Sequence, residues 1–96
     1  MANNATAAAM LAALKIDLGI TATNFDARLI SRIETARERI ESMGIRLSDT
    51  ESDRDLILMY AAWLWRSRVT QAPMGRMLQQ ALNNRLMGQA AREATT

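Results

Sequence analysis

The chain contains no cysteine and no histidine. These absences exclude disulfide bonds, thiol nucleophiles, imidazole general bases and ordinary zinc sites, and with them most familiar enzyme chemistry. The glycines are isolated from one another, so no glycine-rich loop is present to hold a phosphate. No carboxylate lies within an apolar stretch, where an acid and base pair would be expected. We therefore expect no enzyme, no catalytic residues and no cofactor or metal.

The sequence also lacks a long hydrophobic run. Residues 1–6 have neither the basic start nor the apolar stretch of a secretory signal, and we expect an intracellular protein. The longest apolar run is the ten residues 56–65, which hold both tryptophans and the only tyrosine. As a helix it would span about 15 Å, half the thickness of a bilayer core, so we expect no membrane partner. The run predicts a buried central helix that is apolar on all sides.

Helical periodicity accounts for most of the chain, and no strand pattern or internal repeat occurs. We predict an all-α bundle of four helices at about 6–18, 24–43, 51–68 and 73–88. A single domain would cover residues 1–90, followed by a flexible tail over 91–96. Gly19 and Gly44 are placed to end the first and second helices, and Pro73 to begin the last.

The second helix has one apolar seam and should be solvated on its other side. The apolar residues recur at spacings of four, four, three, four and three, namely at Phe25, Leu29, Ile33, Ala36, Ile40 and Met43. Thr23 or Asn24 would cap this helix, and Thr50 or Ser52 would cap the central one.

Charge is distributed unevenly, although the formal net charge is only +2. Residues 49–55 carry a local charge of −3, whereas the basic positions between 66 and 92, set against Glu93, give +4. Acids at the start of the central helix and arginines at its end both complement the helix dipole. The basic C-terminal third also permits contact with phosphate, for which Arg66, Arg68 and Arg76 are the candidates.

Two recognisable patterns in residues 44–60 fail on inspection. Asp49, Glu51, Asp53 and Asp55 imitate the first ligands of a calcium loop, but Arg54 stands where that loop needs glycine and Tyr60 where it needs glutamate. A helix-turn-helix around Gly44 would present the same acids to DNA, across a linker longer than the motif allows. Helix capping and solvation explain these acids better.

The remaining signals concern contact surfaces. The seven methionines suit an irregular core, yet the all-round apolar helix and the uncharged face of the last helix favour self-association. One stripe of the central helix would serve the core and the other a neighbouring copy. The candidate interface residues are Leu58, Trp65, Gln79, Gln80, Asn83 and Asn84.

The order of these elements resembles the small helical head-tail connector proteins, also called adaptor or head-completion proteins, of long-tailed bacteriophages. The resemblance spans roughly residues 10–90 and lies in four segments, namely 16–20 (IDLGI), 25–29 (FDARL) with the close at 43–45 (MGI), 59–64 (MYAAWL), and 73–78 (PMGRML) with 81–86 (ALNNRL). None of these is a chemical motif, and it is their order and spacing that resemble the family.

The resemblance implies a structural role in the virion, assembled in the bacterial cytoplasm. Such proteins form a homo-oligomeric ring, on the order of a dozen subunits, that joins the portal of the DNA-filled head to a downstream head-completion or tail protein. They line part of the genome channel and meet double-stranded DNA without sequence preference. Two alternatives are a small phage DNA-binding or packaging regulator and a helical adaptor for another protein.

Overall fold

The computed structural model describes residues 2–94, and the side chains of residues 7–94. Four helices make up the fold: α1 (Ala2–Leu18), α2 (Asp26–Ser42), α3 (Glu51–Thr70) and α4 (Arg76–Ala94). No strand occurs between residues 2 and 94, and the predicted all-α, four-helix class is confirmed. None of the helices in this described part is long and apolar enough to span a bilayer.

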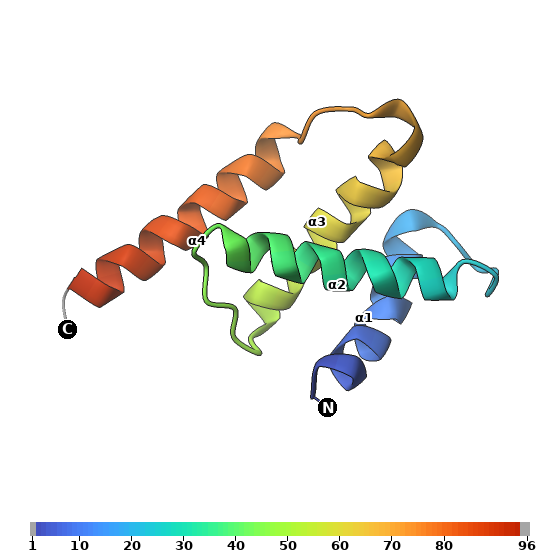
Figure 1. Ribbon diagram of the computed structural model, residues 1–96, viewed down its shortest axis with the longest axis horizontal. Helices are drawn as coiled ribbons and strands as arrows, with labels where there is room; N and C mark the ends of the chain where they lie inside the picture. The colour runs from blue at the N-terminus through green and yellow to red at the C-terminus, as the bar shows by residue number, and fades with distance from the viewer. Residues whose placement is uncertain (1, 95–96) are drawn as a thin grey trace.

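Helix α3 is the centre of the molecule. It packs against α1, α2 and α4, while α1 and α2 also pack on each other. Figure 1 shows α4 at one side of the molecule, passing the end of α2 and the loop that follows it. Most of the apolar run of α3 is buried, at Leu56, Ile57, Tyr60, Ala61, Ala62, Leu64 and Trp65. The run therefore forms the centre of the core, as predicted, but not on all sides, because Leu58 and Trp63 are half-buried and Met59 is exposed.

Helix α2 buries the seam that its periodicity predicts, at Leu29, Ile33, Ala36 and Ile40. Its start differs from the prediction, because Phe25 occupies the N-cap position and no side chain caps the helix. Asp26 instead accepts a hydrogen bond of 2.8 Å from Lys15 Nζ of α1. The expected cap by Thr23 or Asn24 is absent, and the start of α2 is instead joined to α1 by this ion pair.

The glycine that follows each of the first two helices adopts the left-handed backbone conformation. Gly19 has φ 71° and Gly44 has φ 99°. The N–H of Ile20 donates to the Lys15 carbonyl at 2.9 Å and that of Gly19 to Ile16 at 3.2 Å, which is the Schellman pattern. The predicted helix ends are therefore correct in position.

The bounds of α4 correct the prediction at both ends. The helix begins at Arg76, because Gly75 accepts its first intrahelical hydrogen bond, from Gln79 N at 3.1 Å, and so acts as the N-cap. Pro73 precedes the helix. The helix continues to Ala94, through most of the expected tail, because alanines at 90, 91 and 94 favour helix and Gln89 is tied to the loop after α2.

Candidate functional site

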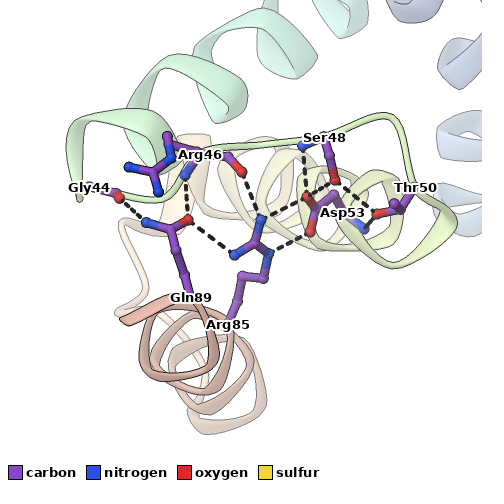
Figure 2. A network of polar contacts seen from close by, with 7 residues as sticks. All are labelled: Gly44, Arg46, Ser48, Thr50, Asp53, Arg85 and Gln89. Atoms are coloured by element: carbon purple, nitrogen blue, oxygen red, sulfur yellow. Dashed lines mark hydrogen bonds and ion pairs between the residues drawn. The ribbon is translucent and has the colours of Figure 1, made fainter. Parts of the chain in front are cut away.

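The most organised polar feature is a network that we call the polar lock, formed by Asp53, Arg85, Gln89 and the loop 44–48 (Figure 2). Arg85 Nε donates to Asp53 Oδ1 at 2.8 Å, and its Nη2 donates to Asp53 Oδ2 at 3.1 Å and to the Arg46 carbonyl at 2.7 Å. Gln89 Nε2 donates to the Gly44 carbonyl at 2.8 Å, and Gln89 Oε1 accepts from Arg46 N at the same distance. The lock joins α4 to α3 and to the loop between α2 and α3.

Asp53 is the buried centre of the lock, with only 2% of its surface exposed. Hydrogen bonds from Arg85, then from the backbone and hydroxyl of Ser48, lower the pKa of Asp53 from 3.8 to about 2, although burial opposes this shift. The same hydrogen bonds, which Arg85 donates to the Asp53 carboxylate, raise the pKa of Arg85. Both groups are charged at neutral pH and hold each other in place.

The lock is built for structure rather than chemistry. Asp53 accepts four hydrogen bonds, one at Oδ1 and three at Oδ2, and no buried side-chain nitrogen or oxygen in the described part of the chain lacks a partner. A carboxylate accepts about four hydrogen bonds, so those within the protein account for the acceptor capacity of Asp53. We assign the lock to positioning α4.

Thr50 and Asp53 show how the lock uses a helix cap. Thr50 is the N-cap of α3, as predicted, and its hydroxyl accepts from Asp53 N at 3.3 Å. In a capping box the side chain at position 53 would in turn accept a hydrogen bond from the backbone N–H of Thr50. Here the Asp53 carboxylate is turned to Ser48 and Arg85 instead.

The sequence analysis did not identify Arg85 and Gln89 as partners of Asp53 and of the loop 44–48. The signal was present in the spacing, because Leu78, Leu82, Arg85 and Gln89 recur at intervals of four, three and four and share one face. Leu78, Leu82 and Gln89 are buried, whereas Met77, although apolar, is 79% exposed. The buried stripe of α4 is thus apolar in its first half and polar in its second.

The predicted interface residues differ in how far they are exposed. Trp65 is only 7% exposed, packs edge-on against Phe25 with ring centroids 5.4 Å apart, and is a core residue, which corrects its assignment to a neighbouring copy. Leu58 is half-buried. On α4, the amide face is exposed at Gln79, Gln80, Asn83 and Asn84, where a partner could contact it.

The three predicted phosphate contacts also differ from one another. The Arg68 guanidinium lies 3.8 Å from the centre of the Trp65 ring and donates to the Trp65 carbonyl. Arg66 is exposed and donates to the Asp17 carbonyl at 3.3 Å. Arg76 is exposed in the first turn of α4, which contains no acid. All three side chains are exposed, and Arg68 differs in being held against the Trp65 ring.

Two hollows lie along α3. The first, of about 530 Å³, has an acidic rim and an apolar floor; we call it the acidic pocket, and it is lined by Ala9, Met10, Ala13, Asp49, Glu51, Arg54, Asp55 and Leu58. The second, of about 500 Å³, lies toward the end of α3 that carries Arg66, which we call the arginine end. It is lined by Asp17, Leu58, Met59, Ala62, Trp63, Arg66, Gly75, Met77 and Leu78. Leu58 borders both, so the two hollows belong to one partly apolar face, which is acidic at one end and carries Asp17 and Arg66 at the other.

The acids that imitate a calcium loop do not converge. Asp53 belongs to the lock, and Asp49 accepts a hydrogen bond of 3.0 Å from Arg54. Within residues 2–94, no three carboxylates come together in a way that could hold a metal ion. These acids make the start of α3 the acidic end of the helix.

Comparison with models of known protein families, with curated proteins and with solved structures yields no match.

Proposed function

We propose that this protein is a structural subunit that assembles with copies of itself into a ring, as a head-tail connector of a phage or prophage. The observation that carries the proposal is the broad exposed face of α4. Of its 19 residues, Leu78, Leu82 and Gln89 are buried and Ala81, Arg85 and Leu86 half-buried, whereas the others are exposed, and the lock holds the helix in a fixed direction. An exposed helix face held rigidly is suited to contact a neighbouring subunit.

The exposed surface supports the same proposal. The chain exposes 6373 Å². A compact monomer of 10.7 kDa exposes roughly 5,500 Å², so the excess is roughly 900 Å². One partner in a stable protein interface buries about 800 Å². The excess is therefore of the size that one subunit contact would cover.

The dimensions of the molecule agree with this surface. Its extents are 47 × 32 × 19 Å and its radius of gyration is 13.8 Å, against about 12.5 Å for a compact chain of this length. A flat subunit with one projecting helix offers two different faces to its neighbours, as the head-to-tail contacts of a cyclic ring require.

The proposed partners are the portal of the DNA-filled head, a downstream head-completion or tail protein, and double-stranded DNA in transit. Arg66 and Arg76 are exposed and carry no base-reading arrangement, which suits weak contact with phosphate. Such contact would let a genome pass without tight binding. The proposed location is the virion, with assembly in the host cytoplasm.

The mass of the protein in solution tests this proposal. Native mass spectrometry over a concentration series, with electron microscopy of the largest species, should show a discrete closed oligomer. DNA affinity at two salt concentrations is the companion measurement. A monomer at every concentration that binds duplex DNA with a steep salt dependence would replace the connector by the DNA-binding regulator.

A further inference from the structure

The first turn of α4 forms an exposed knob beside the arginine end of α3. Met77 is 79% exposed, and its neighbour Arg76 is exposed as well. Gly75, just before the helix, lines the same hollow as Arg66. We call Arg76 and Met77 the knob. It combines a flexible apolar side chain with a positive charge at the positive end of a helix dipole.

The acidic pocket has the complementary chemistry. Its floor is apolar, from Met10 and Leu58, with Ala9 and Ala13 adding small side chains that leave room for an inserted group. Its rim carries Asp49, Glu51 and Asp55 against the single charge of Arg54. A methionine beside an arginine fits such a pocket, because the thioether can fill the floor while the guanidinium meets the rim.

Within one chain the knob lies at the other hollow of α3, where Met77 and Leu58 line the same space, and Met77 does not line the acidic pocket. That hollow is bordered by Arg66, eleven residues beyond Asp55 of the acidic rim, which is about 16 Å along the helix axis. An ion pair requires contact within about 4 Å. The acidic rim is therefore left open to a positive charge from a second molecule.

We infer that the knob of one copy docks into the acidic pocket of a second copy, with Met77 on the Leu58 floor and Arg76 on the Asp55 rim. The inference rests on the self-association in the proposed function and names the surfaces that make it. The carboxylates of the rim also face the start of the neighbour's α4, whose first turn has no acid of its own. The second copy thus supplies the negative charge that the helix dipole favours.

The test is Met77→Glu against the matched control Met87→Glu, each compared with the unmodified protein by native mass spectrometry over a concentration series. Both methionines are exposed on α4, at 79% and 69%, so neither substitution disturbs the core. A carboxylate at position 77 meets the acidic rim, and self-association should weaken about thirtyfold or more, as at an interface centre. Met87→Glu should assemble like the unmodified chain.

A mixing experiment adds a positive result. Arg76→Glu/Met77→Glu removes the knob and Glu51→Lys/Asp55→Lys reverses the rim, so each variant alone should remain a monomer. Each variant keeps the surface that the other has lost, so mixing them should produce a one-to-one heterodimer. Absence of that heterodimer, with both variants shown to be folded by circular dichroism, overturns the docking.

Because the chain has no cysteine, a disulfide trap gives an independent readout. Ala9→Cys and Met77→Cys are made on separate chains and mixed under mild oxidation, with Ala9→Cys and Met87→Cys as the control mixture. A cross-linked pair should form quickly in the first mixture only. Equal cross-linking in both mixtures contradicts the inference.

The outcomes separate this inference from the proposed function. If the unmodified protein assembles and Met77→Glu assembles equally well, the docking is wrong and self-assembly stands. If the unmodified protein stops at two copies and Met77→Glu separates them, the docking stands and the ring is wrong. If no assembly occurs at any concentration, both are wrong.

Discussion

Replacing Asp53 by asparagine tests the account of the polar lock most directly. The substitution keeps the size of the side chain and removes its charge. It also turns one acceptor oxygen into an N–H donor, which then faces N–H groups of Ser48 or Arg85. The Arg85 guanidinium, only 18% exposed, is left partly buried beside a neutral partner.

The expected loss is about 2–4 kcal/mol of unfolding free energy, the range for breaking a buried, hydrogen-bonded ion pair from one side. A domain of this length has roughly 5–14 kcal/mol in total. The loss should lower the urea midpoint by at least about 1 M at neutral pH. Asp55→Asn is the matched control, because Asp55 is exposed on the same helix turn, and its change should stay within about 0.5 kcal/mol.

The pH dependence provides the second readout. Asp53 has a lower pKa in the folded chain, about 2, than its ordinary value of 3.8. Its stabilising contribution is therefore complete above about pH 4 and is lost as the pH falls toward 2; the shift corresponds to about 2 kcal/mol. The stability gap between the unmodified protein and Asp53→Asn should shrink over that interval. A difference in unfolding free energy below about 0.5 kcal/mol at pH 7, or a difference that does not change with pH, would refute the reasoning.

Four further substitutions test single elements of the fold. Gln89→Ala removes both bonds to the loop at Gly44 and Arg46, so amide hydrogen exchange should accelerate in the last two turns of α4 while the core stays protected. Thr50→Ala removes the cap of α3 and should lower the unfolding free energy by about 1 kcal/mol in urea titration. Gly44→Ala should destabilise the chain by about 1 kcal/mol because φ is +99°, whereas Gly88→Ala, inside α4 with open space around it, should stabilise it by about 0.5–1 kcal/mol.

Local patterns predicted the parts of the fold that depend on local physics. The α2 seam at Leu29, Ile33, Ala36 and Ile40 follows from helical geometry alone, and the ends at Gly19 and Gly44 follow from the left-handed conformation that glycine tolerates. The Thr50 cap is likewise a matter of a few neighbouring residues. Where the determining contact lies within one turn, the sequence was sufficient.

The errors arose where the determining contact lies far along the chain. Trp65 was given to a neighbouring copy because the sequence does not show that Phe25, on the approach to α2, covers its ring. Arg85 was counted only toward the positive charge of the C-terminal third, because its partner Asp53 is 32 residues away. A polar residue on a buried stripe is predicted correctly only once its partner is known.

The two tryptophans lie in different surroundings, which gives the protein a pair of native optical probes. Trp65 is enclosed by Phe25 and Arg68, so its emission will follow global unfolding. Trp63 donates its indole N–H to the Ala72 carbonyl at 3.3 Å and borders the hollow beside Met77. With phenylalanine at position 65, the remaining fluorescence would register events at the molecular surface near α4, and no attached dye would be needed.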